Sequence, residues 1–261
     1  LKSEVHDFWN KSACGTFMVG KEKYTLEYFE ELEQLRYSMQ PEIQDFAQFS
    51  MAKDKKILEV GVGAGTDFLQ WVRSGANAYG IDLTEEAIEH VKHRLNLYGL
   101  EAEGYAVADS ETLPFENDEF DLVYSWGVIH HTPDTEKAMM EIIRVCKPGG
   151  KVKVMIYHRH SLLAYFFWIK HALLKLRPWK SLAWVLWNKM ESIGTKGFTK
   201  KEVRKMLYGQ PVKIIKIHPV LSYYDRLERF NKVFQIISKN ASALLGGDRV
   251  GWELLIELEK K

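Results

Sequence analysis

Short apolar runs alternate with longer helical stretches from Lys56 onward. The runs are rich in Val, Ile, Leu and aromatic residues, and the stretches between them keep a helical period over roughly a dozen residues. Such alternation is typical of a parallel sheet built from βαβ units. The predicted strands are 56–60, 77–82, 104–109, 120–126, 151–157, 212–218 and 252–259. We therefore expect an α/β fold.

Residues suited to helix N-caps precede several predicted helices. These caps are Thr25, Thr84 and Thr199, the last in capping-box spacing with Glu202. Further helical patterns cover 42–50 after Pro41, then 67–75, 85–99, 135–146 and part of the region between the last two strands. We expect a single domain, 1–261, made of an N-terminal helical segment (1–50), a core (51–160), a helical insert (161–210) and the final strands (211–261).

Composition narrows the class of protein. Apolar residues at 46% and charged residues at 27% are ordinary for a globular protein and suggest neither disorder nor a membrane span. A formal net charge of +1 gives no global basic field, which disfavours a nucleic acid as main partner. The two cysteines, Cys14 and Cys146, have neither a disulfide nor a metal-ligand pattern, and the N-terminal residues lack a signal-peptide pattern. A reducing cytoplasm is the expected location, with no metal.

Three glycines follow the first predicted strand in the segment EVGVGAGT. Glycine permits positive φ and lets a ligand touch the main chain. The dinucleotide fingerprint needs a third glycine at the position of Thr66, which argues against a nicotinamide oxidoreductase, and no phosphate-loop lysine is present. The loop suits a ligand with ribose and amino-acid parts. The alternative is a tight turn that binds nothing.

Two aspartates end the next strands along the chain. Asp82 closes the second predicted strand, where a carboxylate can accept both hydroxyls of a ribose, and Asp109 closes the third, where it can accept from an adenine amino group. The alternatives are a capping role for Asp82 and a surface turn for Asp109. Parallel strands bring these ends to one edge of the sheet, the edge at which open α/β sheets bind ligands.

The ordered motifs LEVGVGAGTD, GIDLT, ADSETLPF, FDLVYSWGVIHHTPD and RVCKPGG resemble those of class I S-adenosylmethionine-dependent methyltransferases. The match is closest to the branch with ubiquinone/menaquinone-biosynthesis and small-molecule enzymes, and it covers Lys56 to Tyr157. The resemblance implies a doubly wound, Rossmann-like, seven-stranded sheet with its last strand antiparallel. It also implies S-adenosylmethionine as cofactor. The residues that would bind it are Glu59, Gly61, Gly63, Gly65, Asp82, Leu83, Asp109, Ser110, Glu111, Ser125 and Trp126.

Methyl transfer also needs an aligned acceptor and, for a hydroxyl or acidic carbon, a base. His130 and His131 follow the fourth strand, and unperturbed imidazole titrates near neutral pH. We favour His131, which lies nearer the loop and is expected to be less buried. Both could instead only hold the turn before Pro133. Tyr157 and Arg159 follow the fifth strand and are candidates for acceptor binding, unless that loop is merely solvated.

Two helical segments are candidates to enclose the acceptor. At the N-terminus, Phe8, Trp9 and Cys14 would form a dry lid with Trp9 touching the acceptor, or the helix simply packs on the sheet. We call the aromatic-rich first part of the helical insert, 161–190, the insert from here on. One helical face of it carries Leu162, Tyr165, Phe166, Ile169, Leu173 and Leu176, until Pro178 breaks the helix. This face either packs on the sheet or lines an apolar cavity whose floor is Trp126 and His131.

The expected function is methyl transfer to a small-molecule acceptor, hydrophobic or aromatic, which the basic face of the insert could take from a membrane surface. The insert is too short and too charged to span a membrane. Nucleic-acid and protein methyltransferases are disfavoured, because the fourth strand ends in SWGV rather than a DNA-enzyme motif and no paired-glutamate loop is present. The alternative is a lipid- or membrane-surface-binding protein on the same scaffold. The methylated atom and the oligomer stay open.

Overall fold

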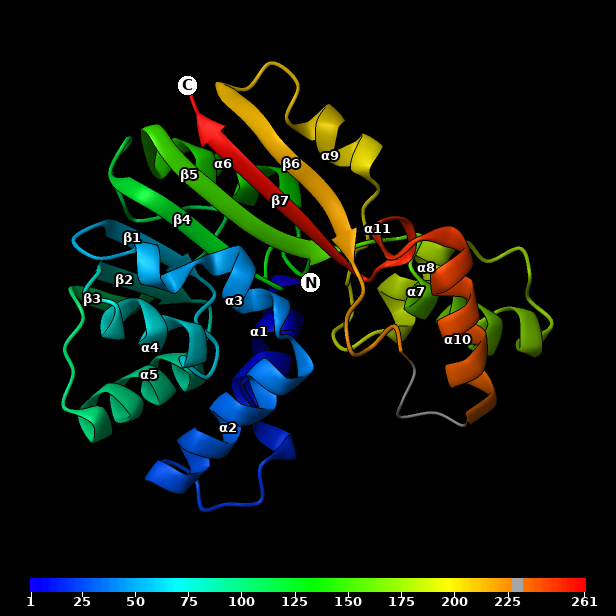
Figure 1. The fold of residues 1–261 in the computed structure, drawn as a ribbon, viewed down its shortest axis with the longest axis horizontal. Coiled ribbons are helices and arrows are strands. Elements are labelled where there is room, and N and C mark those ends of the chain that lie inside the picture. The colour runs from blue at the N-terminus through cyan, green and yellow to red at the C-terminus, as the bar shows by residue number, and fades with distance from the viewer. Residues whose placement is uncertain (227–231) are drawn as a thin grey trace.

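A seven-stranded sheet forms the centre of the computed structural model, which describes residues 1–226 and 232–261 (Figure 1). The strands are β1 (Lys56–Val60), β2 (Asn77–Asp82), β3 (Gly104–Val107), β4 (Phe120–Trp126), β5 (Cys146–Tyr157), β6 (Val212–Val220) and β7 (Glu253–Lys260). Their order is β3-β2-β1-β4-β5-β7-β6. Pairs among β1–β5 are parallel, whereas β7 runs antiparallel to β5 and β6. The predicted doubly wound sheet with an antiparallel last strand is confirmed.

Helices cover both faces of the sheet. One face packs against α3 (Glu42–Ala47), α4 (Thr66–Arg73) and α5 (Glu85–Tyr98), in a cluster that includes the fully buried Trp71 and Tyr124. The other face packs against α6 (Thr135–Val145) and α9 (Lys200–Met206). Because strand residues alternate between faces, each central strand contributes to both clusters.

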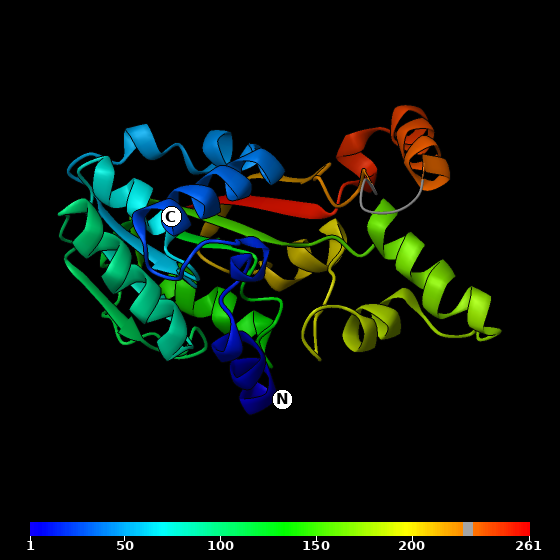
Figure 2. The same cartoon turned by 90° about the horizontal axis from the view of Figure 1, so that it is seen from below.

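The N-terminal segment lies over the carboxyl edge of the strands (Figure 2). The part over this edge contains α1 (Lys2–Lys11), η1 (Thr16–Met18) and α2 (Leu26–Met39). η2 (Phe49–Met51) follows α3 and packs with it on the face of the sheet through Phe49. Contacts with the start of α5 hold α1 in place, since the Asn10 side chain accepts from the Glu86 N–H at 3.1 Å and His6 lies 3.1 Å from the Glu85 carboxylate.

The predicted helix caps are present. Thr25 accepts from the Tyr28 N–H, and Thr84 accepts from the Ala87 N–H. Thr199 and Glu202 form a reciprocal capping box at the start of α9. Some strand boundaries differ from the prediction. β3 ends at Val107 rather than at Asp109, where the backbone turns away from its pairing with β2, and β5 begins at Cys146 rather than at 151. The bounds of β6 and β7 differ by one or two residues.

The insert forms a separate helical group beyond the ends of β5 and β7 (Figures 1 and 2). Its elements are α7 (Leu162–His171), η3 (Leu173–Lys175) and α8 (Leu182–Lys189), joined by α10 (Lys232–Leu245) and α11 (Gly247–Val250). The helical region predicted before the last strand is found in α10 and α11, while 227–231 lie outside the described residues.

The prediction of which residues form the buried apolar face of the insert is wrong. The buried residues of α7 are Leu163, Ala164 and Phe166, which pack against Leu186 of α8 and Trp252. Most of the predicted face is exposed instead, with Tyr165 at 44%, Ile169 at 38%, Leu173 at 43% and Leu176 at 83%. Helical periodicity fails here because α7 ends at His171, and because its packing partners are helices rather than the sheet.

Candidate active site

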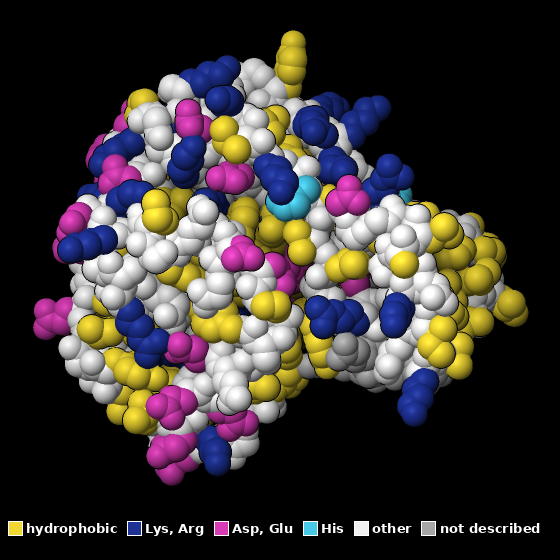
Figure 3. Space-filling view, viewed as in Figure 1, with side chains coloured by type: hydrophobic (Ala, Val, Ile, Leu, Met, Phe, Trp, Pro, Cys, Tyr) yellow, Lys and Arg dark blue, Asp and Glu magenta, His cyan; other side chains and the backbone are white. Residues whose placement is uncertain are grey.

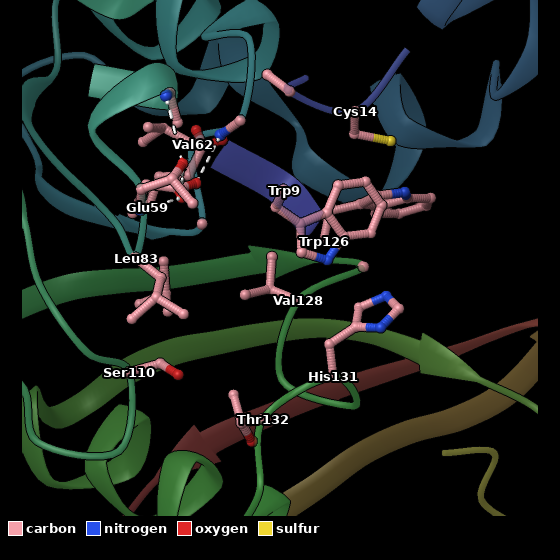
Figure 4. A pocket seen from close by; sticks show the side chains of 18 of the residues that line it. Trp9, Cys14, Glu59, Val62, Leu83, Ser110, Trp126, Val128, His131 and Thr132 are labelled. Carbon is pink, nitrogen blue, oxygen red and sulfur yellow. Dashed lines mark hydrogen bonds between the residues drawn. The ribbon is translucent and has the colours of Figure 1, made fainter. Parts of the chain in front are cut away.

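A cavity opens at the carboxyl edge of the sheet, between the loops after β1, β2 and β4 and the N-terminal segment (Figure 4). It is lined by eleven of the residues selected from the sequence: Trp9, Glu59, Gly61, Gly63, Asp82, Leu83, Asp109, Ser110, Trp126, His131 and Tyr157. Residues that are far apart in the chain therefore meet where the strand order predicts they should.

The glycine loop brings bare backbone to this cavity. A Cβ on Gly61 would lie 2.1 Å from Cγ2 of Val128, so only glycine fits between the two loops. Gly63 has a φ of +51°, and a Cβ built on it would meet nothing within 4 Å, so this residue faces the open space of the cavity. The loop can thus accommodate a ligand against its main chain.

Gly65 has a different role from the one predicted. It does not line the cavity but serves as the N-cap of α4 with a φ of +72°. A Cβ there would approach Cγ2 of Val91 to 3.0 Å. Gly65 therefore allows α4 to pack closely on α5, the packing task that the third glycine performs in dinucleotide-binding folds.

Asp82 connects the glycine loop to the start of α5, and its ribose-binding role stays a prediction. One carboxylate oxygen accepts from the Gly63 N–H at 3.0 Å, and the other accepts from the N–H and the hydroxyl of Thr84 at 3.0 and 2.9 Å. Burial raises the pKa of this carboxyl group, and the three hydrogen bonds oppose that change. Because a carboxylate offers about four lone-pair sites, Asp82 keeps acceptor capacity toward the cavity.

The loop after β3 is tied to the N-terminus of the chain. Lys2 donates to Asp109 at 2.5 Å and to Glu111 at 3.0 Å, and the hydrogen bond to Asp109 is the main reason that the pKa of Lys2 is raised. Glu111 also accepts from the Asp134 N–H at 2.8 Å. Glu111, predicted to contact the cofactor, does not line the cavity because these structural contacts use its carboxylate.

Glu59 reaches the cavity as a buried acid. Its side chain is nearly inaccessible, and Oε2 has no hydrogen-bond donor among the described residues. Burial raises the pKa of Glu59 well above its usual value, Asp67 raises it further, and Arg36 opposes both. A donor or cationic group on a ligand would complete this site.

Asp67 was not selected from the sequence, yet it is the most fully bonded acid of the cavity. Its carboxylate accepts two hydrogen bonds from Arg36, at 3.0 and 2.5 Å, one from Tyr37 at 3.1 Å and one from Tyr124 at 3.0 Å. Two separate elements, α2 and β4, supply these donors to an acid on a third, so no local sequence pattern could reveal the network. It attaches α2 to α4 and β4.

His131 is buried rather than exposed, contrary to the prediction. Burial first and Lys196 second lower its pKa to about 3, so the ring is neutral near pH 7. Nδ1 lies 2.9 Å from the Ser192 hydroxyl and 3.1 Å from the Thr195 hydroxyl. Thr195 donates its own proton to the Ser192 carbonyl at 2.7 Å, so toward His131 it can only accept.

The contacts of Nδ1 are compatible with a proton on that nitrogen. Thr195 can only accept from Nδ1, whereas the closer Ser192 hydroxyl can either accept from it or donate to it. When Nδ1 carries the proton, Nε2 holds a free lone pair. Nε2 lies 3.9 Å from Oε2 of Glu191, another cavity residue, and the ring lies beside Trp9 at 5.5 Å between centroids (Figure 4). His131 thus places Nε2 at the aromatic end of the cavity, and this nitrogen is unprotonated in the tautomer that carries its proton on Nδ1.

Three other predicted site residues lie outside the cavity lining. His130 is fully buried with its ring 3.8 Å from that of Tyr157, and burial holds its pKa well below the usual value. Ser125 points to the opposite face of β4 from Trp126, as strand alternation requires. Arg159 donates to the Gly197 carbonyl at 3.0 Å and pairs with Glu202 at 2.8 Å.

The predicted lid is partly present, whereas the predicted wall from the insert is absent. Trp9 and Cys14 line the cavity, but Phe8 does not, being 42% exposed and packed edge to face with Trp9. No residue of 161–190 lines the described cavity, because the insert packs on itself and on Trp252. Residues that sequence reasoning missed complete the lining, among them Lys2, Arg36, Gln40, Asp67, Glu191, Tyr224 and Glu253.

Comparisons with known proteins agree with this geometry. Residues 58–154 match the family model described as a methyltransferase domain. Phosphoethanolamine N-methyltransferase 2 of Caenorhabditis elegans is 35% identical over 102 residues, which is 39% of this chain and 23% of that protein. A phthiotriol/phenolphthiotriol dimycocerosates methyltransferase of Mycobacterium ulcerans is 36% identical over 98 residues, 37% of this chain and 35% of that protein. The match thus spans about a third or less of the length of each of these curated relatives.

The fold has solved counterparts along its whole length. The geranyl diphosphate C-methyltransferase of Streptomyces coelicolor, solved with Mg²⁺, geranyl diphosphate and S-adenosyl-L-homocysteine, superposes with a TM-score of 0.65 at 11% identity. That alignment covers 100% of this chain and 97% of the other. At this identity the likeness establishes the fold alone.

The doubly wound sheet with a cavity at its carboxyl edge is the Rossmann-like fold of that solved methyltransferase. Residues 58–154 match a methyltransferase domain, in agreement with the resemblance of the sequence motifs to class I S-adenosylmethionine-dependent methyltransferases. The methyltransferase domain predicted from the sequence is confirmed over these residues, while the ubiquinone/menaquinone branch stays a prediction.

Proposed function

We propose that this protein transfers a methyl group from S-adenosylmethionine to a small hydrophobic or aromatic acceptor. The observation that carries the proposal is one continuous cavity with two unlike ends. At one end lie the Gly63 backbone and the carboxylates of Asp82 and Asp109. At the other end lie aromatic side chains and Nε2 of His131.

The residues present fit the cofactor. Gly63 leaves space where a side chain would otherwise stand, and Asp82 keeps acceptor capacity for ribose hydroxyls. The unpartnered Oε2 of Glu59 suits a cationic amino group. Ser110 and Leu83 lie beside Asp109 at the end proposed for the adenine.

The chemistry divides simply between cofactor and protein. When bound, S-adenosylmethionine supplies an electrophilic methyl group on its sulfonium, and the sulfur keeps the bonding electrons. The protein aligns the acceptor and excludes water, for which Trp9, Trp126 and Tyr157 provide apolar surface. With its proton on Nδ1, His131 accepts the proton of an acceptor hydroxyl at Nε2.

Glu191 can stabilise the protonated form of His131. Its carboxylate lies 3.9 Å from Nε2 and accepts from the Tyr157 hydroxyl at 3.1 Å. The cavity raises the pKa of Glu191, but 39% of its side chain remains exposed, so the group retains access to solvent and can ionise. An ionised Glu191 would offset the burial that disfavours imidazolium.

The acceptor class rests on the apolar character of the inner end. The named relatives act on chemically different acceptors, a phosphoethanolamine and a phthiotriol, so their names do not select one. Transfer of labelled methyl from S-adenosylmethionine to a panel of phenols, prenylated quinols and aliphatic alcohols tests the proposal. Cofactor binding without transfer to any hydrophobic acceptor would favour the alternative of a binding protein on this scaffold.

We expect Asp82→Ala to weaken binding of S-adenosyl-L-homocysteine by about 1–3 kcal/mol, because ribose hydroxyls lose their acceptor and the Gly63 N–H loses its partner. Isothermal titration calorimetry measures the change, and circular dichroism checks the fold. Asp45→Ala, which changes an exposed aspartate of α3, is the matched control. Unchanged affinity in a folded Asp82→Ala protein would remove Asp82 from the cofactor site.

We expect Thr195→Val to lower turnover by about tenfold or more, because Nδ1 of His131 loses the acceptor that fixes its proton. Valine keeps the shape of threonine but cannot accept a hydrogen bond. Thr195→Ser keeps the hydroxyl and should restore most of the activity. Equal rates in the valine and serine variants would show that Thr195 only fills space.

A further inference from the structure

The end of the molecule farthest from β3 has an unusual charge and surface. The insert, 161–190, contains no Asp or Glu but carries Lys170, Lys175, Arg177, Lys180 and Lys189, although the whole chain has a net charge of only +1. None of these five side chains forms an ion pair within the described residues. Burial lowers the pKa of His171, and the charges of Lys170, Lys189 and Lys175 lower it further, as expected in a positive field.

Large apolar side chains are exposed among these charges. Every residue from 173 to 179 is exposed, and Leu174, Leu176 and Trp179 expose 70%, 83% and 74% of their surface. The same stretch contains Lys175 and Arg177. We call 173–179 the insert tip. Monomeric proteins rarely expose adjacent large apolar residues without a binding role.

A second helix extends this surface. α10 packs beside α7 through the rings of Phe166 and Phe234, 4.9 Å apart, and exposes Ile236 at 60% and Ile237 at 56%. Residues 232–247 also contain no acid. Figure 3 shows hydrophobic side chains gathered at this end of the molecule, with Lys and Arg beside them.

We propose that the insert tip and α10 dock on the surface of an anionic lipid bilayer. Leu174, Leu176 and Trp179 would enter the interfacial layer, while Lys175 and Arg177 reach the lipid phosphates. No helix in the described ranges is long and apolar enough to cross a membrane, so the contact is with one leaflet. A second copy of this chain fits the surface poorly, because a two-fold interface would set these basic side chains against themselves.

The location of this surface gives it a role in the proposed methyl transfer. The small core beneath α7 and α8 is packed against Tyr157 and Tyr224, and both of these residues line the cavity. Docking would therefore hold the aromatic end of the cavity near the bilayer, where a hydrophobic acceptor is concentrated. Membrane binding itself does not depend on that function.

Vesicle flotation of the whole protein tests the proposal. We expect binding to vesicles that contain phosphatidylserine with phosphatidylcholine, weak binding to phosphatidylcholine alone, and release as salt is raised. Leu176→Ser with Trp179→Ser should weaken binding by about tenfold or more. Lys175→Glu with Arg177→Glu should do the same and remove the dependence on anionic lipid.

The matched control is Phe17→Ser with Tyr208→Ser, which removes two equally exposed aromatic residues elsewhere, at 74% and 88% exposure. It should bind vesicles like the unmodified protein. Calorimetry with S-adenosyl-L-homocysteine should give unchanged affinity in all variants and so show that they are folded. The proposal is overturned if the unmodified protein binds neither vesicle, if control and tip variants lose binding alike, or if sedimentation shows a dimer that the tip variants dissociate.

Discussion

Replacing His131 by alanine should lower turnover on a hydroxyl acceptor by about 10²–10⁴-fold and leave cofactor affinity nearly unchanged. The reason is geometric. His131 presents Nε2 at the aromatic end of the cavity, and this nitrogen can accept a proton in the tautomer in which Nδ1 donates to Thr195. The contacts proposed for the ribose and adenine lie at the other end, on Asp82 and Asp109, and do not involve His131.

Single-turnover kinetics with labelled S-adenosylmethionine would measure this effect, with calorimetry for cofactor affinity. His93→Ala, which removes an imidazole that is 43% exposed on α5, is the control. If His131→Ala retains its turnover, alignment alone carries the reaction and His131 is structural.

The pH dependence of activity and of stability should reflect the lowered pKa of His131. Because burial lowers the pKa of His131 to about 3, its neutral form persists far below pH 6.5. His131 therefore contributes no loss of kcat/KM as the pH falls through 6.5. It does contribute to stability, since the unfolded chain binds a proton at this residue between pH 6.5 and about 3 while the folded chain does not. The free energy of unfolding should therefore decrease as the pH is lowered through that window, and the decrease should be smaller in His131→Ala.

The strands and the cofactor edge could be predicted because their signals are local. A glycine loop after a strand, an aspartate at a strand end and a threonine before a helix each act through neighbouring backbone, as at Gly63, Asp82 and Thr84. Parallel topology then brings the strand ends together without further information.

The acceptor end could not be predicted in the same way. Its residues come from segments that meet only in the folded chain, such as Glu191 after the insert and Glu253 at the start of β7. The burial of His131 depends on Ser192 and Thr195, which are more than sixty residues away in sequence. Ser125 could have been corrected from alternation along β4, because Tyr124 and Trp126 both face the other cluster.

The link between the N-terminal segment and the sheet rests on a buried ion pair. Arg36 on α2 donates two hydrogen bonds to Asp67 at the start of α4, and the Asp67 side chain is 1% exposed. Tyr37 and Tyr124 donate to the same carboxylate. Removing the acid alone would leave a guanidinium and two hydroxyls without their acceptor inside the protein.

We therefore expect Asp67→Ala to lower the free energy of unfolding by about 3 kcal/mol, near the lower end for a broken buried pair because Arg36 keeps 24% of its side chain exposed. Urea unfolding followed by circular dichroism measures the change. Removing both charges, with Arg36→Met and Asp67→Leu, should cost less than Asp67→Ala alone, because no unpaired charge is left. Glu259→Ala breaks the more exposed pair with Lys151 at 2.5 Å and should change stability much less than Asp67→Ala does. A double variant less stable than Asp67→Ala would show that the network stabilises through packing rather than charge.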